Sequence, residues 1–488
     1  MTQPQFTDFY TILPFTILVV WACLLLLADL FIPKDRKGIT AFLAAFGLAG
    51  TMGYAITQVG LSSMGFSGMV FLDGFSTYAN ILLLISGLLG IAVAYGYNQR
   101  MGIERGEYYT LLLFSVSGMM LMAQAADLII VFLALELLSI PLYVLAAFTR
   151  KLESEEAGVK YFLLGAFATG FVVYGTALVY GATGTTSLTG IFLSASNGTS
   201  GLLLTIGAAL LLVGFGFKVA AVPFHMWTPD VYQGAPTSVT AFMSSGAKIA
   251  GFVALLRVFA TAFPSISADM TDILWAMSAI TMIVGNFIAI SQTNIKRLLA
   301  YSSIAHAGYI LMAFVPYGNK EVMSISIAAG LFYLLTYVLT NFGAWAVVIS
   351  LEKAEGNPST GSGQRGLELS DYSGLARKYP ALAAAMAVFM LSFIGFPPTL
   401  GMVGKFYLFR AVIAGGFNGL AIIGVVTSLV SAYYYLRVVV NMYFREGDPT
   451  IEREPGLAFT TMVTAVATVA LSFVPQWLFL LASTALLK

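Results

Sequence analysis

Five ionisable side chains stand inside long apolar stretches of this chain, and their types could do chemistry. Glu136 lies in LALELLSIPLY, Lys218 in GFGFKVAAVP, Lys248 in FMSSGAKIAGF and Lys405 in LGMVGKFYLF, and His306 lies in a further apolar stretch. Burial lowers the pKa of a lysine and a nearby carboxylate raises it, so a lysine whose neighbour moves can gain or lose a proton. Histidine titrates near neutral pH. The set has the chemistry of a proton relay.

The elements that hold these residues must be membrane helices. The 488 residues are 59% hydrophobic and only 10% charged, whereas soluble domains are about 25% charged. A helix needs about 20 apolar residues to cross the hydrocarbon layer, and in lipid its backbone groups must be bonded within the segment. We therefore expect an all-α polytopic membrane protein.

Apolar windows predict about fourteen transmembrane helices. They lie near 11–32, 39–58, 78–97, 108–125, 127–149, 157–181, 201–222, 238–263, 271–292, 300–316, 324–351, 380–415, 417–444 and 457–486. The seventh run stops at Pro223 and continues as a shorter amphipathic piece through Val231. The twelfth is broken by Gly395, Pro397, Pro398 and Gly401. Such breaks free backbone groups that need water or protein partners, which favours an interior cavity.

The basic residues predict the sidedness of the chain, because inner-side loops carry the lysines and arginines. Sixteen of the 24 fall in loops after odd-numbered spans: Lys34, Arg36, Lys37, Arg100, Arg105, Arg150, Lys151, Lys296, Arg297, Lys353, Arg365, Arg377, Lys378, Arg437, Arg445 and Arg453. Loops after even-numbered spans hold Lys320 and little else. Both termini should therefore face the outer side. The stretch 352–379, rich in Gly, Ser and charge, is expected to be a flexible inner-side linker.

A structural interpretation competes with the relay. Buried charges can snorkel to the interface or pair to lock helices together, and we favour that reading for Lys160, Arg257 and Arg410 near span ends. However, the chain has three mid-span lysines and one mid-span glutamate, so simple ion pairing would leave positive charge without a partner. His306 fits a hydrogen-bonded packing residue equally well.

Several other polar residues are weaker candidates. Lys160 and His225 are kept as secondary relay or intake residues. Asp73, Asp127 and Asp230 are expected to be solvated or to cap helices.

The sequence contains no motif for redox centres, nucleotide binding or metal binding. Its single cysteine, Cys23, can build neither a disulfide nor a cysteine-ligated iron–sulfur cluster alone. The chain contains no phosphate-binding loop, dinucleotide fingerprint or Cys/His metal cluster. Its net charge of +1 and scattered basic residues argue against nucleic acid. Neither a cofactor nor a metal ion is therefore expected in this chain, and the driving force must come from an ion gradient or a partner.

Three stretches carry a resemblance to a known family. They are GFKVAAVPFHMWTPDVYQGAPTSVTAFMSSGAK (Gly216–Lys248), SQTNIKRLLAYSSIAHAGY (Ser291–Tyr309) and FIGFPPTLGMVGKFYLF (Phe393–Phe409). The chain resembles, from Thr11 to Leu486, the antiporter-like membrane subunits of bacterial respiratory complex I (NADH-quinone oxidoreductase). It is most similar to subunit N, because Lys405 stands where the M-type has glutamate and the long C-terminal extension of the L-type is missing.

The resemblance implies a domain plan. Residues 1–107 would form three peripheral helices, 108–263 a first antiporter-like repeat, and 271–444 a second, inverted repeat that includes the loop 352–379. Residues 445–488 would add a fourteenth helix. Inverted repeats commonly place broken helices at equivalent positions, which agrees with breaks in the seventh and twelfth spans.

The resemblance also implies the relay roles. Glu136 and Lys218 match the family's charge pair, Lys248 its central lysine and Lys405 its outward-side lysine, while His306 falls between the last two. Protons would enter from the inner side toward Lys218 and Lys248 and leave through Lys405.

The same resemblance implies the setting. The chain would lie in the bacterial inner membrane beside neighbouring antiporter-like and small subunits of complex I. NADH, FMN, iron–sulfur clusters and quinone would belong to partner subunits.

Two alternatives remain open. A cation/proton antiporter subunit, or the membrane subunit of a related hydrogenase, would share the core and the buried groups. A sodium site would want clustered oxygens, however, and Glu136 is the single mid-membrane carboxylate. A purely structural spacer would tolerate neutral replacement of the buried charges.

Overall fold

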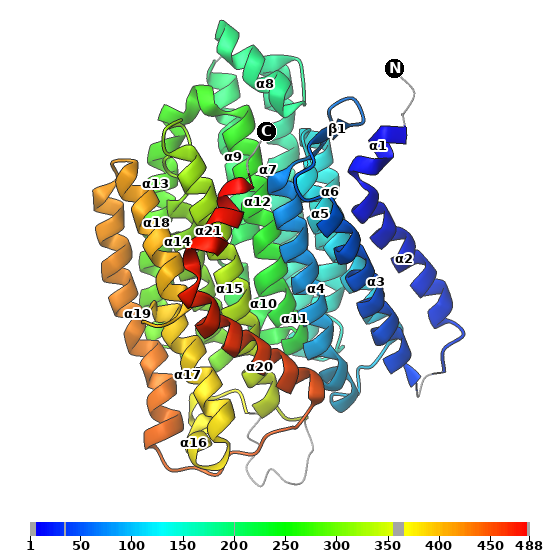
Figure 1. The fold of residues 1–488 in the computed structure, drawn as a ribbon, viewed down its shortest axis with the longest axis vertical. Helices are drawn as coiled ribbons and strands as arrows, with labels where there is room; N and C mark the ends of the chain where they lie inside the picture. Colours follow the sequence, from blue (N-terminus) through cyan, green and yellow to red (C-terminus); the bar gives the residue numbers. More distant parts are fainter. Residues whose placement is uncertain (1–5, 34–35, 200, 355–365, 486–488) are drawn as a thin grey trace.

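The computed structural model describes residues 6–33, 36–199, 201–354 and 366–485 as one bundle of long, roughly parallel helices (Figure 1). The first helices are α1 (Phe6–Thr11), α2 (Leu13–Asp29), α3 (Gly38–Thr57), α4 (Gly74–Arg100), α5 (Gly106–Gln124), α6 (Leu128–Ala146) and α7 (Leu152–Thr183). Ten helices in the described residues are long and apolar enough to cross a membrane, and Leu13–Asp29 and Pro380–Ile394 are shorter apolar helices. The polytopic all-α fold is confirmed, and the count of fourteen stays a prediction.

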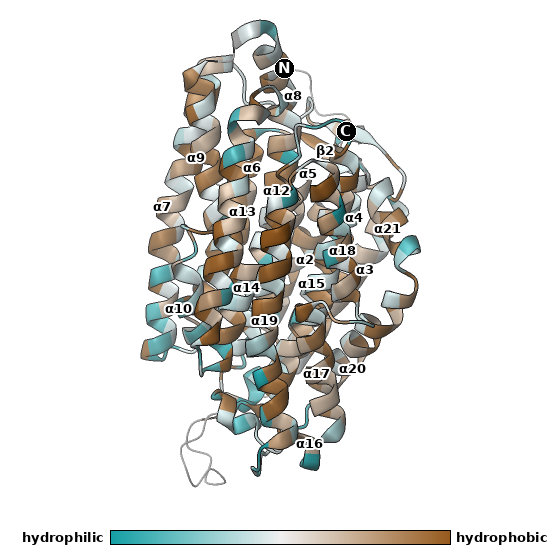
Figure 2. Cartoon of the chain, turned by 90° about the vertical axis from the view of Figure 1, so that its left-hand side faces the viewer, coloured by the Kyte–Doolittle hydropathy of each residue, from teal (hydrophilic) through white to brown (hydrophobic). Residues whose placement is uncertain are grey.

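The central helices hold most of the relay candidates. This part of the chain forms α8 (Leu188–Ser194), η2 (Ala195–Thr199), α9 (Leu202–Val219), α10 (Trp227–Gly234), α11 (Thr237–Phe242), η3 (Met243–Ala247), α12 (Lys248–Ala262), η4 (Pro264–Ile266), α13 (Ser267–Ile290), α14 (Ile295–Met312) and α15 (Met323–Leu351). The window that spans α11, η3 and α12 is completely buried inside the bundle. Brown, apolar residues cover much of the outer helices in Figure 2, as expected of a surface that meets lipid.

The C-terminal part completes the bundle. Its elements are η5 (Leu369–Tyr372), α16 (Leu375–Lys378), α17 (Pro380–Ile394), α18 (Leu400–Ala414), α19 (Asn418–Phe444), α20 (Pro455–Ala470), η6 (Leu471–Phe473) and α21 (Pro475–Thr484). Helices α20 and α21 pack across α15 and α4, so they tie this part to the N-terminal part. In Figure 1, α1 and α21 lie toward one end of the bundle and α16 lies at the other.

Both helix breaks predicted from proline and glycine are present. Helix α9 ends with Ala220 in the left-handed region, and α17 ends with Gly395 in the same region. Each break frees carbonyl groups, and a side chain bonds one of them. The Trp227 indole donates to the Phe217 carbonyl (3.0 Å), and the Lys405 ammonium donates to the Ile394 carbonyl (2.9 Å). At each break one freed carbonyl is thus bonded within the protein, while Met226 and Phe396 of the two breaks lie exposed on the surface.

Four features differ from the sequence predictions. A short antiparallel hairpin, β1 (Ser63–Gly65) with β2 (Val70–Leu72), precedes α4. A π-helical turn, η3, interrupts the eighth predicted span. Pro475 divides the last span into α20 and α21, because proline cannot continue the hydrogen-bond ladder.

The fourth difference concerns the stretch expected to be a flexible linker. Its described part folds into η5 and α16, because Leu367 and Leu369 bond to the backbone around Ile295 and Thr293. The segment 355–365 of that stretch, which includes Arg365, lies outside the described residues. Lys34, one of the basic residues used to predict sidedness, also lies outside them.

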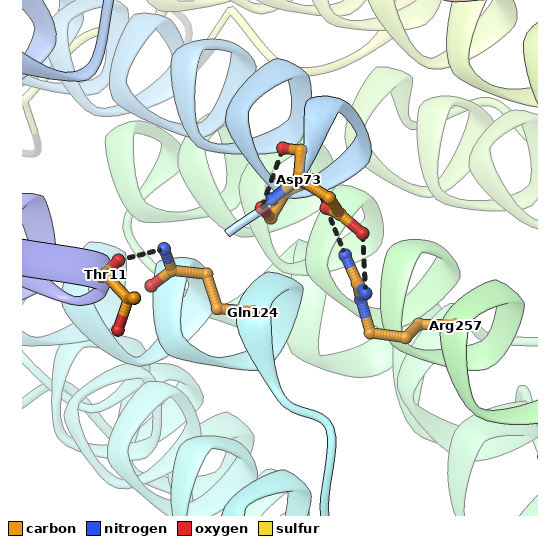
Figure 3. A network of polar contacts seen from close by, with 5 residues as sticks. Thr11, Asp73, Gln124 and Arg257 are labelled. Carbon is orange, nitrogen blue, oxygen red and sulfur yellow. Dashed lines mark hydrogen bonds and ion pairs between the residues drawn. The ribbon is translucent and has the colours of Figure 1, made fainter. Parts of the chain in front are cut away.

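A buried polar network joins α12 to the start of α4 (Figure 3). Arg257 of α12 donates two hydrogen bonds to the Asp73 carboxylate (2.8 and 3.0 Å), and both side chains are 1% exposed. Asp73 also accepts from the Ser76 N–H and so caps α4. Nearby, the Gln124 amide donates to the Thr11 carbonyl (3.0 Å). The interpretation of Arg257 as a structural ion-pair residue and of Asp73 as a cap is confirmed, while the alternative that Asp73 is solvated is wrong.

Candidate functional site

Lys218 lies in the last turn of α9, just before the break. Its ammonium donates to the Ser139 hydroxyl (2.8 Å) and the Tyr161 hydroxyl (3.3 Å), and it lies 5.5 Å from the Tyr161 ring centroid. Tyr161 stacks in turn on Trp227 of α10, 4.5 Å between centroids. Lys218 is 3% exposed, so hydroxyls and a ring face replace its water shell.

Glu136 lies near Lys218 without forming an ion pair with it in the described residues. Both α6 residues, Glu136 and Ser139, face this region, and Glu136 interacts electrostatically with Lys218. The Glu136 carboxylate instead accepts a hydrogen bond from the Thr169 hydroxyl of α7 (2.8 Å). The pair is therefore held apart, with a hydroxyl satisfying each partner.

Lys248 follows directly after the π-helical turn η3. Its ammonium donates to the Ser303 carbonyl of α14 and lies 5.8 Å from the Tyr337 ring centroid. The hydroxyls of Ser244 and Ser245 in the π turn accept from the Asn341 amide (2.7 and 2.8 Å). A π turn commonly occurs at functional sites because it re-aims side chains, and here it precedes the buried lysine by one residue.

His306 is bonded at both ring nitrogens. Nδ1 lies 2.7 Å from the Tyr333 hydroxyl, and Nε2 lies 3.1 Å from the Tyr435 hydroxyl, which also bonds Ser302. A neutral imidazole has one donor and one acceptor nitrogen. Two hydroxyl partners can satisfy either tautomer, so His306 can exchange which nitrogen carries the proton.

Lys405 lies in α18, beyond the second break. Besides the Ile394 carbonyl it donates to the Ser428 hydroxyl (2.6 Å), and it lies 4.5 Å from the Tyr309 ring centroid. Lys218, Lys248, His306 and Lys405 are each at most 4% exposed.

Helix α14 aligns the second half of this set. Ser303 contacts Lys248, His306 follows three residues later, and Tyr309, three residues further, contacts Lys405. Residues three apart share one helix face. One face of α14 therefore runs from one buried lysine to the next, with the histidine between them.

Lys160 does not join the buried set. Its side chain is 41% exposed and bonds Glu156 (2.7 Å) and Asp230 (2.9 Å), and Asp230 also pairs with Arg297 (2.8 Å). Glu156, Lys160 and Asp230 line a polar pocket of about 590 Å³, to which Ser370 and Asp371 of η5 also contribute. Lys160 is thus a pocket-lining ion-pair residue.

The remaining secondary candidate, His225, and two residues expected to be structural, Asp127 and Arg410, lie outside the buried set. His225 lies in the break after α9 and is 8% exposed, and the hydrogen bonds described for Lys218 and Lys248 do not include it. Asp127 caps α6 by accepting from the Ile129 N–H (2.8 Å) and the Thr186 hydroxyl (2.8 Å), which confirms the capping interpretation. Arg410 is exposed at the α18 surface.

Sequence reasoning missed the hydroxyls that connect the charges. Tyr161, Tyr333 and Tyr435 contact the buried charges, yet each lies in an apolar stretch and looks like core filling. Tyr309 is the exception, since its position three residues after His306 could have placed it on the same face. Among the described residues, no group of three or more His, Cys, Asp or Glu side chains is placed to hold a metal ion.

Comparison with known proteins gives a consistent family. The family model described as NADH:quinone oxidoreductase/Mrp antiporter, TM, matches residues 125–431. A protein of Trichlorobacter lovleyi named NADH-quinone oxidoreductase subunit N is 48% identical over 91% of this chain and 89% of its own length.

Solved structures share the whole fold. A chain of respiratory complex I from Thermus thermophilus with bound aureothin is 37% identical, with a TM-score of 0.82 over 96% of this chain and 99% of its own. A chain of the Mrp complex from Dietzia sp. is 22% identical, with a TM-score of 0.85 over 99% of this chain and 97% of its own. The second likeness concerns the fold alone.

Proposed function

Because this chain belongs to the family of NADH-quinone oxidoreductase subunit N, we propose that it is a proton-translocating membrane subunit of such an enzyme. It does no redox chemistry itself and is driven by quinone reduction in partner subunits. Helix α14 carries this proposal, because its Ser303 carbonyl accepts from Lys248, its Tyr309 ring faces Lys405, and His306 lies between these two residues in the helix. A lone buried charge needs no such row of titratable and hydroxyl groups.

The proposed route runs through four buried groups. Protons enter from the inner side toward Lys218 and Lys248, pass His306 and internal water, and leave from Lys405 to the outer side. Buried hydroxyls without a partner among the described residues, such as those of Ser303 and Tyr337, offer bonding sites for that water. The Tyr333 and Tyr435 hydroxyls on the two ring nitrogens give His306 a partner on each side.

Glu136 acts in the proposal as the control on Lys218. In the described arrangement Thr169 holds the carboxylate and Ser139 holds the ammonium. If Glu136 turns toward Lys218, the charged ammonium is stabilised, and if it turns back, the proton is released. The separation of the two groups supports such a two-state pair.

The setting follows from the same proposal. The chain lies in the bacterial inner membrane with both termini on the outer side, beside other antiporter-like and small membrane subunits. NADH, FMN, iron–sulfur clusters and quinone belong to partner subunits. The location of α1 and α21 toward one end of the bundle, opposite α16, supports this orientation.

Replacement of the buried lysines tests the proposal. Lys218→Met and Lys405→Met in the native assembly should lower the number of protons moved per electron while the subunit composition stays intact. Lys320→Met, at an exposed loop position, is the matched control and should pump normally. Normal pumping in both buried-lysine variants would sink the proposal.

A further inference from the structure

A second pair of buried charges lies outside the relay described above. Lys296, in the first turn of α14, is 2% exposed, and Glu352, which ends α15, is 8% exposed. The two interact electrostatically, and Glu153 adds a second carboxylate. Burying an ammonium and a carboxylate costs the hydration energy of both groups. At helix ends, where water is close, such burial suggests that the two groups have a function.

Lys296 bonds the backbone where the fully buried span begins, and Glu352 is connected to the same backbone through Tyr97. The Lys296 ammonium donates to the Ala235 carbonyl (2.7 Å). The Tyr97 hydroxyl accepts from the Thr237 N–H (3.1 Å) and donates to one oxygen of Glu352 (3.4 Å). The other oxygen of Glu352 is buried with no hydrogen-bond partner among the described residues.

Two pockets adjoin this cluster. The pocket of about 590 Å³ is lined by Gly234 and Asn294, which adjoin Ala235 and the start of α14. A second pocket, of about 310 Å³, is lined by Leu351 and Lys353, the neighbours of Glu352 in the chain. The cluster therefore lies between two polar openings and the core.

Polar groups continue from the cluster to Lys248. Ser303 lies seven residues beyond Lys296 on the same side of α14, about 10 Å along a helix that rises about 1.5 Å per residue. Its carbonyl holds Lys248, and the Tyr232 side chain approaches its hydroxyl from α10. The hydroxyls of Thr237, Ser303 and Tyr337 are buried without hydrogen-bond partners among the described residues.

We infer that Glu352, Tyr97 and Lys296 form a second inner-side proton intake that loads Lys248 without passing through Lys218. A proton from inner-side water binds the Glu352 carboxylate. It then moves by hydrogen-bond exchange through Tyr97, water held by the orphaned hydroxyls, and Ser303 to the unprotonated amine of Lys248, which leaves Glu352 ionised again. Lys296 is a positioning residue, since its hydrogen bond fixes Ala235 at the start of the buried span and its ammonium interacts electrostatically with Glu352.

This inference rests on the proposed function, and a double replacement separates the two. Protons moved per electron are measured in vesicles that contain the native assembly. Lys218→Met should give an intermediate ratio, because the second intake still works. Lys218→Met with Glu352→Gln should fall to the ratio of Lys405→Met, in which the shared exit is lost.

A matched control isolates the position of the carboxylate. Glu446 is an exposed inner-side carboxylate whose side chain is 87% exposed. Lys218→Met with Glu446→Gln should keep the ratio of Lys218→Met alone. If Glu352→Gln prevents assembly, Tyr97→Phe, which removes one oxygen, replaces it in the double variant with the same expected result.

Three outcomes overturn the inference. The double variant could keep the ratio of Lys218→Met, the Glu446 control could fall as far as the double variant, or Lys218→Met alone could already match Lys405→Met. A normal ratio in Lys405→Met is a different failure, because it removes the proposed function itself.

Discussion

At the scale of single residues, the cost of burial makes the charges informative. A charged side chain at the bilayer centre costs roughly 2.5 to 3.5 kcal/mol on insertion scales. Here each ammonium is surrounded by hydroxyls, backbone carbonyls and tyrosine rings. Such partners stabilise a charge without neutralising it permanently, as a carboxylate would. That difference suits a group that must release its proton.

The two adjacent tyrosines of α19 give a matched pair for testing the histidine contact. Tyr435→Phe removes the hydroxyl at His306 Nε2, whereas Tyr434→Phe removes one that donates to Asn286 (2.9 Å). We expect Tyr435→Phe to lower protons moved per electron and Tyr434→Phe to leave the ratio near that of the parent. Proton uptake by vesicles measures both, and equal ratios in the two variants would contradict the role of His306.

The Asp73–Arg257 pair should contribute to stability rather than transport. Arg257→Met leaves the Asp73 carboxylate buried without its counter-charge, which costs about 3 to 5 kcal/mol. The thermal unfolding midpoint of the assembly should fall clearly. Arg377→Met, which removes an exposed pair with Glu446, should leave it nearly unchanged. Similar midpoints for the two variants would refute this.

The same pair predicts an acid limit. Burial would raise the pKa of the Asp73 carboxyl, but the Arg257 guanidinium and the Ser76 N–H outweigh burial and hold it below its usual value. A depressed folded-state pKa gives stability that is present above the unfolded value of about 3.9 and is lost as pH falls through the folded value. The midpoint of Arg257→Met should therefore depend less on pH below about 4 than that of the parent, and parallel pH profiles would contradict this.

The residue types predicted which charged side chains make up the candidate site, but they did not predict which side chains form hydrogen bonds with them. Glu136, Lys218, Lys248, Lys405 and His306 were predictable because a charge in an apolar run is improbable without a use. The distance between Glu136 and Lys218 was not, since it depends on Thr169 and Ser139, whose hydroxyls are common in membrane helices. The buried pair Lys296 and Glu352 was missed because both lie next to loops, where charged residues are expected to meet water.

At the scale of elements, close helix contact should govern the relay. A Cβ at Gly308 of α14 would lie 2.6 Å from the Met282 backbone nitrogen of α13, closer than atoms can pack. Gly308→Ala should push α14 away from α13 and displace His306, two residues earlier. We expect lower pumping and a loss of about 1 to 3 kcal/mol in stability from overpacking.

Gly170→Ala is the control for that replacement. Gly170 lies within α7, and a Cβ there would have no neighbour within 4 Å. Pumping and the unfolding midpoint should both stay near those of the parent. A Gly308→Ala assembly that behaves like Gly170→Ala would show that this helix contact does not position the relay.

Element positions were largely predictable, and the exceptions have local causes. Apolar windows located the long helices, and Pro223, Pro397 and Pro398 marked both breaks. The π turn before Lys248 has no proline or glycine pattern that distinguishes it from an ordinary helix. The helices of the described part of 352–379 depend on pairing with the backbone near Ile295, a long-range contact that composition does not reveal.

At the scale of the whole molecule, the orientation in the membrane is a testable consequence. In a Cys23→Ser background, Lys320→Cys and Lys378→Cys place single thiols at exposed positions in loops predicted to face opposite sides. A membrane-impermeant thiol reagent added from the outer side should label Lys320→Cys and spare Lys378→Cys. The reverse labelling pattern would contradict the proposed orientation of the chain and, with it, the proposed direction of proton transport.

The central claim is that this chain moves protons as part of an NADH-quinone oxidoreductase. The direct measurement is to purify the native assembly by a tag on this chain, place it in vesicles and follow quinone reduction and proton uptake after NADH is added. We expect flavin and iron–sulfur absorbance in the assembly, and proton uptake that depends on NADH oxidation. A colourless assembly that exchanges sodium for protons without oxidising NADH would contradict it.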